Sequence, residues 1–284
     1  MTLLDAAILG LVEGLTEYLP VSSTGHLILT SALLGLDGPG IDAFNIVIQG
    51  GAILAVLGLY RRRVLGMAQS LSGNNSEGQR LLIRLLIAFA PAAILGPLLE
   101  DSIEATLFQP IPVLSALALG GLVMLKLGKA PSPTQTDTDP ADLPLRAAFL
   151  IGLAQCIAMW PGTSRSMVTL AAGVALGLRP VRAAEFSFLL GLPTLGGACV
   201  YKLLKDGDAV FSLGTPSLLV GITVSTVSAT FAARWLVGFL THRGLAPFGW
   251  YRLGLTLVLG AAWAGGLVTL EAEVPAESAP TTAP

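Results

Sequence analysis

EGLTEYLPVSSTGH, residues 13–26, interrupts an apolar region with two glutamates, a proline and a histidine. The apolar segment that follows, 26–36, is too short to cross a bilayer core, which needs about 20 helical residues. Irregular backbone inside a membrane is tolerated only where it is buried in protein or lines a cavity. Segments 3–19 and 26–36 therefore predict a helical hairpin that enters the membrane and turns back within it.

A second polar stretch of the same kind reads PGTSRS at residues 161–166. It lies between the apolar segments 145–160 and 166–178, which predict a second re-entrant hairpin. Residues 10–13, GLVE, are matched by residues 152–155, GLAQ, at the equivalent place ahead of each polar loop. This internal repetition predicts two halves of related structure.

The composition places both hairpins in a membrane protein. Of the 284 residues, 53% are hydrophobic and 12% are charged, whereas a soluble domain carries about twice that charged fraction. The net charge of −2 gives no indication of nucleic-acid binding. The apolar residues fall into ten segments, roughly 3–19, 26–36, 43–60, 81–99, 110–128, 145–160, 166–178, 183–203, 215–236 and 250–270.

The fold predicted from these segments is an all-α polytopic membrane protein with an inverted-topology repeat. Each half has one re-entrant hairpin, about 3–36 and about 145–178, followed by three transmembrane helices. Because three crossings are an odd number, the second half lies upside down relative to the first, as in many transporters. The predicted divisions are repeat 1 at 1–129, a polar linker at 130–144, repeat 2 at 145–270 and a disordered tail at 271–284.

The basic residues predict the orientation of the chain. Lys202 and Lys205 fall on one side of this topology, Arg165 lies in a hairpin loop, and thirteen basic residues share the other side. The positive-inside rule makes that larger group cytoplasmic and both termini periplasmic or exterior. The group consists of Arg61, Arg62, Arg63, Arg80, Arg84, Lys126, Lys129, Arg146, Arg179, Arg182, Arg234, Arg243 and Arg252.

Four ionisable residues lie within the predicted membrane segments: Glu13, Glu17, His26 and Arg165. Ionisable groups are expensive at that depth and indicate a functional site. Glu13 and Glu17 are four residues apart on one helix, so their carboxylates share a face. Such a pair suits a general base or a Mg²⁺ or Ca²⁺ site, because hard cations prefer carboxylate oxygens. The structural alternative is a buried pair satisfied by Thr16 or another hydroxyl.

The first loop offers the hydroxyls of Ser22, Ser23 and Thr24 just before a helix. Hydroxyls and free N–H groups at a helix N-terminus form an anion site, although Ser23 or Thr24 as a simple helix cap is the plainer interpretation. Capping does not account for His26, which could donate a proton to the leaving phosphate or act as a nucleophile.

The second loop surrounds Arg165 with small and hydroxyl residues. The guanidinium fork matches phosphate oxygens in a bidentate manner, and the structural alternative is an ion pair with Glu13 or Glu17. Both roles can coexist if the arginine holds the carboxylates until substrate arrives. The remaining predicted substrate contacts in this loop are Gly162, Thr163, Ser164 and Ser166.

Other polar residues receive structural interpretations. We expect Glu185 either to pair with Arg182 or to lie favourably at a helix N-terminus. Trp250 and Tyr251 fit an aromatic anchor at the membrane interface.

Residues 13–26 and 161–166 together resemble the two signature regions of the undecaprenyl-diphosphatase family, also called the bacitracin-resistance protein family. The resemblance extends to residues 44–49, 183–190 and 248–252, and it covers essentially the whole chain apart from the linker and the tail. It implies a membrane enzyme that removes the terminal phosphate of undecaprenyl diphosphate, and so regenerates the cell-wall lipid carrier and confers bacitracin resistance.

The same resemblance implies a divalent cation, Mg²⁺ or Ca²⁺, and an active site open to the periplasmic side of the inner membrane. The partners it implies are the polyprenyl diphosphate and membrane lipids, and it leaves a homo-oligomer open. Because their positions match the signature regions of the family, the resemblance implies catalytic or phosphate-binding roles for Glu13, Glu17, Ser23, Thr24, His26 and Arg165.

Two other classes compete with this interpretation. A transporter or lipid-phosphate flippase would also have inverted repeats with broken helices. A second lipid-phosphatase class pairs a Ser-Arg motif with a downstream histidine, but the first histidine after Arg165 is His242, in a predicted cytoplasmic loop. That class is excluded. The nucleophile stays open among Ser23, His26 and water.

Overall fold

The computed structural model describes residues 1–107, 109–128 and 135–267, with the side chains of 100, 101 and 104 left aside. The described residues form helices and no strand, which confirms the all-helical fold; one isolated bridge joins Thr136 to Leu178. The α-helices are α1 (Leu3–Glu17), α2 (Ser23–Leu33), α3 (Pro39–Val47), α4 (Gln49–Leu59), α5 (Arg61–Ser70), α6 (Ser76–Leu107), α7 (Pro110–Leu127), α8 (Leu145–Gln155), α9 (Arg165–Ala175), α10 (Pro180–Ser212), α11 (Thr215–His242) and α12 (Ala246–Ala264). Two short 3-10 helices are η1 (Pro140–Asp142) and η2 (Cys156–Met159).

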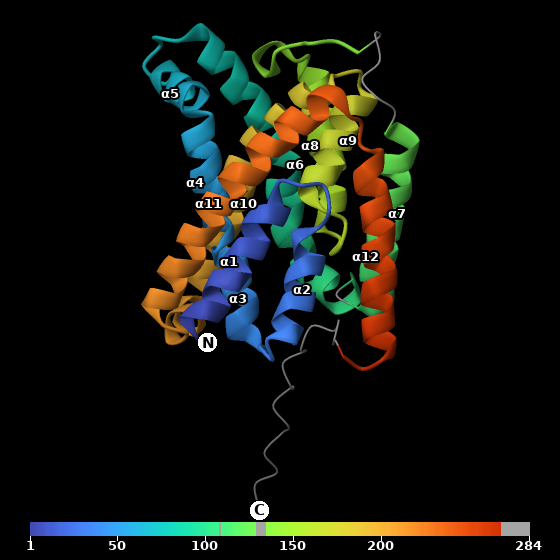
Figure 1. Cartoon of the computed structure of the whole chain (residues 1–284). Coiled ribbons are helices and arrows are strands. Elements are labelled where there is room, and N and C mark those ends of the chain that lie inside the picture. The colour runs from blue at the N-terminus through green and yellow to red at the C-terminus, as the bar shows by residue number, and fades with distance from the viewer. Residues whose placement is uncertain (108, 129–134, 268–284) are drawn as a thin grey trace, which may run out of the picture.

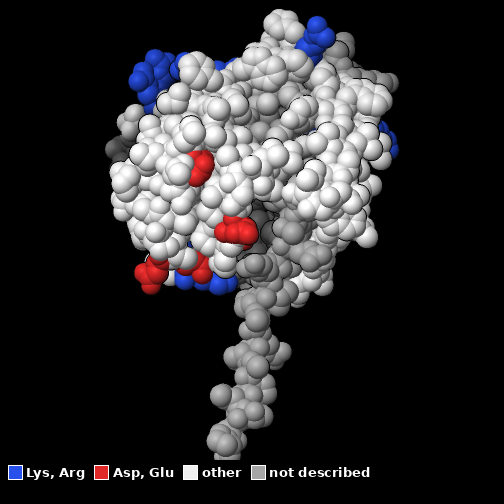
Figure 2. Space-filling model, turned by 60° about the horizontal axis from the view of Figure 1, so that its bottom comes forward, with Lys and Arg blue, Asp and Glu red and all other residues white. Residues whose placement is uncertain are grey.

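Five helices of the described chain are long and apolar enough to cross a membrane. They confirm a multi-pass membrane protein and match five of the six predicted crossings. The sixth predicted crossing, 250–270, forms α12, which is not among these five and packs along α7 (Figure 1). The five spans are Pro39–Leu59, Ser76–Leu99, Pro110–Leu127, Pro180–Ser212 and Thr215–His242. The surface in Figure 2 agrees with this setting, because only scattered charged side chains interrupt a broad uncharged face.

The two predicted hairpins are present as pairs of short helices, α1 with α2 and α8 with α9. The first helix of each pair ends before the polar loop, and a serine caps the second helix. Ser22 Oγ accepts from the N–H of Gly25 at 3.4 Å, and Ser164 Oγ accepts from the N–H of Met167 at 3.3 Å. Among the described non-glycine residues, these two serines alone have a positive φ, 74° and 73°. This conformation is costly away from glycine, so both loops carry the same local strain.

Glycines let each hairpin approach a long helix closely. A Cβ at Gly10 of α1 would lie 2.4 Å from the carbonyl oxygen of Gly221 in α11. A Cβ at Gly152 of α8 would lie 2.3 Å from the carbonyl oxygen of Ala88 in α6. Both hairpins therefore dock by backbone contact, and in Figure 1 α1 lies alongside α11.

Ion pairs join the helices at the end of the molecule where α5 lies. Arg63 pairs with Asp139 and, through Nε at 3.3 Å, with Glu185, and Arg182 Nη1 lies 3.0 Å from Glu185 Oε2. The expected pairing of Glu185 with Arg182 is thereby confirmed. Arg182 also donates to Asp137 at 2.8 Å, and this hydrogen bond lowers the pKa of the Asp137 carboxyl. The described part of the predicted linker, 135–144, is thus tied to α5 and α10, whereas the predicted tail, 271–284, lies outside the described residues.

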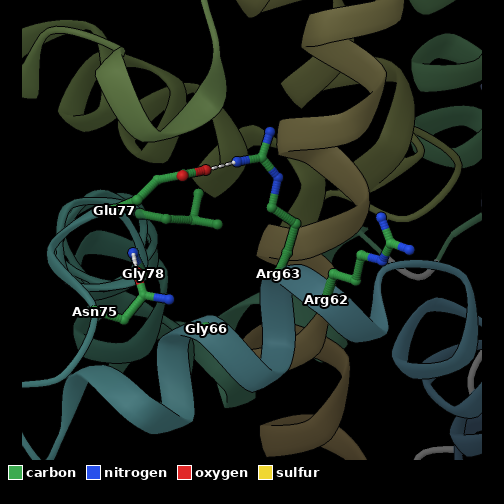
Figure 3. A pocket seen from close by; sticks show the side chains of 7 residues that line it. Arg62, Arg63, Gly66, Asn75, Glu77 and Gly78 are labelled. Carbon is green, nitrogen blue, oxygen red and sulfur yellow. Dashed lines mark hydrogen bonds and ion pairs between the residues drawn. The ribbon is translucent and has the colours of Figure 1, made fainter.

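A pocket of about 290 Å³ opens between α5 and the start of α6. Figure 3 shows Arg63 and Glu77 paired across it, with Arg62 beside them. None of the residues predicted to carry chemistry lines this pocket.

Candidate active site

Glu17 stands at the centre of the contacts between the two loops. One carboxylate oxygen, Oε1, accepts a hydrogen bond from Arg165 Nη2 at 2.9 Å. The other, Oε2, accepts from the hydroxyl of Ser23 at 2.8 Å. Glu17 ends α1, Ser23 starts α2 and Arg165 starts α9, so one carboxylate joins both hairpins.

Arg165 is held by more than this ion pair. Its Nη1 donates to the carbonyl oxygen of Ser187 in α10 at 2.9 Å, and its guanidinium carbon lies 5.8 Å from the centre of the Tyr18 ring. The Tyr18 hydroxyl donates to the carbonyl of Ala52 at 2.7 Å, which fixes that ring. The Nε of Arg165 is buried without a hydrogen-bond partner, so the guanidinium is oriented but keeps an N–H to offer.

Glu13 lies one helical turn before Glu17 and is fully buried. Both of its carboxylate oxygens lack a hydrogen-bond partner, and the charges that act on it come from Glu17 and Arg165. Two buried carboxylate oxygens without donors fit a hard divalent cation. Within the described residues no three His, Cys, Asp or Glu side chains gather to hold a metal. Such an ion would therefore need phosphate oxygens or water beside Glu13 and Glu17.

His26 has a hydrogen bond at each ring nitrogen. Nδ1 lies 2.7 Å from the carbonyl oxygen of Ser22, and Nε2 lies 2.6 Å from the hydroxyl of Tyr251. The His26 and Tyr251 rings are nearly parallel, at 4° and with centroids 5.6 Å apart. The sequence interpretation of Tyr251 as an interfacial anchor therefore missed its contact with a predicted site residue. Its ring is half exposed, but its hydroxyl belongs to the site.

The hydroxyls of the second loop differ in their contacts. Ser166 Oγ donates to the carbonyl of Leu19 at 3.1 Å and lies 3.0 Å from Ser164 Oγ, so it links the second loop to the first. Thr163 Oγ1 is buried without a partner. Gly162 has a φ of +87° and would place a Cβ 2.6 Å from the carbonyl oxygen of Val113, so only glycine fits there. In the first loop, Thr24 is half-buried next to Ser23.

Arg252 is a site residue that the sequence analysis placed elsewhere. It was counted with the cytoplasmic arginines, but its side chain is fully buried. Its Nη2 donates to the carbonyl of Gly162 at 2.9 Å. The signal that could have found it was present, because a lone arginine inside the apolar segment 250–270 is itself an intramembrane charge.

The fold and these contacts define a multi-pass membrane protein with a buried polar site where two hairpin loops meet. A family model described as "Bacitracin resistance protein BacA" matches residues 6–258, and the chain belongs to that family.

Curated relatives carry one name. The chain is 44% identical over 255 residues to "Undecaprenyl-diphosphatase" of Sorangium cellulosum (strain So ce56), covering 88% of this chain and 83% of the relative. It is 43% identical over 270 residues to "Undecaprenyl-diphosphatase" of Acidovorax ebreus (strain TPSY), covering 95% and 98%. It is 44% identical over 273 residues to "Undecaprenyl-diphosphatase 1" of Chromobacterium violaceum, covering 95% and 100%.

Proposed function

We propose that this protein is a membrane enzyme that hydrolyses undecaprenyl diphosphate to undecaprenyl monophosphate and inorganic phosphate. The relatives are named for that activity, and this chain matches them over nearly their whole length. The observation that carries the proposal is the contact of Ser23, Glu17 and Arg165 in one buried site. The reaction recycles the cell-wall lipid carrier and, as the family description states, gives bacitracin resistance.

Arg165 supplies the charge that the diphosphate needs. Phosphoryl transfer depends mainly on positioning and on neutralising the oxygens of the transferred group. Arg165 is fixed by Ser187 and retains a free Nε–H, and its fork can exchange Glu17 for a phosphate oxygen. The guanidinium is therefore ready for substrate before substrate arrives.

Ser23 is the nucleophile that the contacts favour among the three open from sequence. Its hydroxyl donates to Glu17 Oε2 at 2.8 Å, so a base is already in place. Ser23 Oγ attacks the distal phosphorus, the bond to the bridging oxygen breaks, the prenyl monophosphate leaves and Glu17 takes the hydroxyl proton. Water then attacks the phosphorus of the phosphoserine, the bond from phosphorus to Ser23 Oγ breaks, phosphate leaves, and Glu17 returns its proton to Ser23 Oγ. His26 is less suited to attack, because both of its nitrogens are engaged.

A divalent cation, Mg²⁺ or Ca²⁺, is the proposed cofactor. Glu13 and Glu17 would hold it, and when bound it would neutralise charge on the diphosphate. The support is the buried carboxylate of Glu13, which interacts with Glu17 and whose two oxygens receive no hydrogen bond from a protein donor.

The inverted repeat is the proposed architecture, with repeat 1 at 1–129 and repeat 2 at 145–270. The matched serines Ser22 and Ser164 share a rare φ, and each caps the second helix of its hairpin. In Figure 1, α2 descends toward the lower end of the molecule, whereas α8 begins at the upper end. Two hairpins that enter from opposite ends are what an inverted repeat requires.

The proposed orientation puts both termini and the mouth of the site on the periplasmic or exterior side of the bacterial plasma membrane. Burial of Arg252 removes one residue from the thirteen that the sequence assigns to the cytoplasmic side, and the other twelve still support the positive-inside argument.

The activity is tested by measuring phosphate released from undecaprenyl diphosphate by the purified protein in detergent. Removal of one preorganised donor costs about 10²- to 10³-fold in rate, so we expect a loss of that order in Arg165→Ala. Arg234→Ala, which removes an exposed arginine of α11, is the control and should keep full activity. A chelator should abolish release, and added Mg²⁺ or Ca²⁺ should restore it.

Two outcomes would contradict the proposal. Full turnover by Arg165→Ala would remove its assigned role. Movement of the lipid across vesicle membranes without phosphate release would favour the flippase.

A further inference from the structure

Two adjacent residues of α12 contact both loops of the site. The Tyr251 hydroxyl lies 2.6 Å from His26 Nε2 in the first hairpin. The Arg252 guanidinium donates to the carbonyl of Gly162 in the second loop at 2.9 Å. A single turn of one helix therefore reaches both hairpins.

Burial of the charged Arg252 side chain costs free energy, which argues that this residue has a functional role. It is fully buried, and no carboxylate pairs with it among the described residues. Its remaining bonds go to the carbonyls of Leu117 and Ala116 in α7, at 3.2 and 3.1 Å, and Nη1 has no partner. A Cβ at Gly120 of α7 would lie 2.4 Å from Nη2, so α7 makes room for this side chain. A buried charge without a counter-ion is destabilising, and packing alone would favour an apolar residue.

The geometry also fixes the proton on the His26 ring. The carbonyl oxygen of Ser22 can only accept, so Nδ1 at 2.7 Å must carry a hydrogen. In the neutral ring Nε2 is then an acceptor, and the Tyr251 hydroxyl donates to it. The parallel arrangement of the two rings leaves little freedom for His26 to turn.

We propose that Tyr251 and Arg252 are a positioning pair that holds the two loops in register. Tyr251 fixes the hairpin that carries Ser23, and Arg252 fixes the loop that leads into Arg165, so that nucleophile and guanidinium face the same phosphate. The pair acts through these loops and not by touching substrate. This inference rests on the proposed function for its kinetic consequence, but its geometry can be tested separately.

The kinetic test uses two conservative variants in the phosphate-release assay. Tyr251→Phe keeps the ring and removes the hydroxyl, and Arg252→Lys keeps the charge and removes the fork. Small misplacement of reacting groups costs up to about 10²-fold in rate, so kcat should fall about 10- to 100-fold with KM nearly unchanged. Trp250→Phe and Arg234→Lys, exposed neighbours on α12 and α11, are the controls and should match the wild type. Unchanged kcat in both variants, or a loss carried by KM alone, would overturn the inference.

The spectroscopic test exploits the two histidines of the chain. In ¹⁵N-histidine-labelled protein, with His242→Gln used for assignment, the His26 ring should show a protonated Nδ1 and a hydrogen-bonded, unprotonated Nε2. Tyr251→Phe should shift the Nε2 signal, whereas Trp250→Phe should not. A proton resident on Nε2, or no shift in Tyr251→Phe, would refute the pair. This signal can be read even from a protein that releases no phosphate, so failure of the pair and failure of the proposed function are distinguishable.

Discussion

At the scale of single residues, opposite charges and a hydroxyl group contact one another in the candidate active site. Glu17 divides its two oxygens between Arg165 and Ser23. A buried ion pair is no assurance of stability, because desolvation offsets much of the attraction. In the proposed mechanism its value is orientation: the carboxylate that neutralises the arginine at rest would also accept the serine proton during attack. Binding of phosphate to Arg165 would then release Glu17 as a base.

Ser23→Ala distinguishes attack by serine from attack by water. If Ser23 forms the covalent intermediate, loss of its hydroxyl should reduce phosphate release by about 10³-fold or more, as with nucleophiles of other hydrolases. Ser212→Ala, an exposed serine at the end of α10, provides the comparison and should retain wild-type release.

A rapid-quench experiment on the same variant measures the covalent intermediate directly. With ³²P in the distal phosphate, label should appear on the wild-type protein within the first turnover and be missing from Ser23→Ala. A Ser23→Ala enzyme that keeps more than about a tenth of the activity would exclude Ser23 as the nucleophile and leave water or His26.

The sequence predicted part of this site for a physical reason. Glu17, His26 and Arg165 stood out because charged groups are rare in apolar segments, and the matched loops implied that they meet. Tyr251 and Arg252 were placed at a membrane interface and a cytoplasmic surface, because their roles depend on how α12 packs against the loops. The charge of Arg252 inside an apolar segment is a local signal, but nothing local in the sequence specifies which loops Arg252 and Tyr251 contact.

At the scale of elements, glycines and capping serines determine how the hairpins dock. The predicted hairpins are present because a Pro- and Ser-containing loop followed by a short apolar segment cannot span a bilayer. Two features were not predicted: the break between α3 and α4 at Ile48, and α5 as a separate helix. The break at Ile48 falls inside the continuous apolar segment 43–60, shortly before Gly50 and Gly51, and α5 begins with three consecutive arginines just after that segment ends.

Gly14→Ala tests the contact between α1 and α11. A Cβ at Gly14 would lie 2.0 Å from Ser228 Oγ and 2.4 Å from the carbonyl oxygen of Ser225, and the backbone atom cannot yield. Overpacking of this kind costs about 1–3 kcal/mol, so the thermal unfolding midpoint in detergent should fall. Because α1 carries Glu17, phosphate release should fall as well.

Gly58→Ala is the matched control for this substitution. Gly58 lies in α4 with no atom within 4 Å of an added Cβ, and alanine favours a helix by about 0.5–1 kcal/mol. Its unfolding midpoint should stay equal or rise. Equal stability of Gly14→Ala and wild type would show that α1 and α11 are not packed this closely.

At the scale of the whole molecule, the proposed inverted repeat brings the two hairpins to one site from opposite sides. α1 rests on α11 through Gly10, and α8 rests on α6 through Gly152, so each half supports the hairpin of the other. This exchange of supports keeps the two loops together in the middle of the bundle. Inversion of the two halves stays a prediction from parity, since an odd number of crossings per half forces inversion.

Cysteine accessibility decides whether the halves are inverted. After Cys156→Ser and Cys199→Ala substitutions remove the native thiols, single cysteines are introduced by Asp37→Cys, after the first hairpin, and by Leu176→Cys, after the second. Both positions are exposed at the ends of their hairpins. A membrane-impermeant maleimide should label Asp37→Cys in spheroplasts and Leu176→Cys only in inside-out vesicles, because inverted halves place these matched positions on opposite sides. Labelling of both positions from the same side would show that the halves are not inverted and would overturn the proposed architecture.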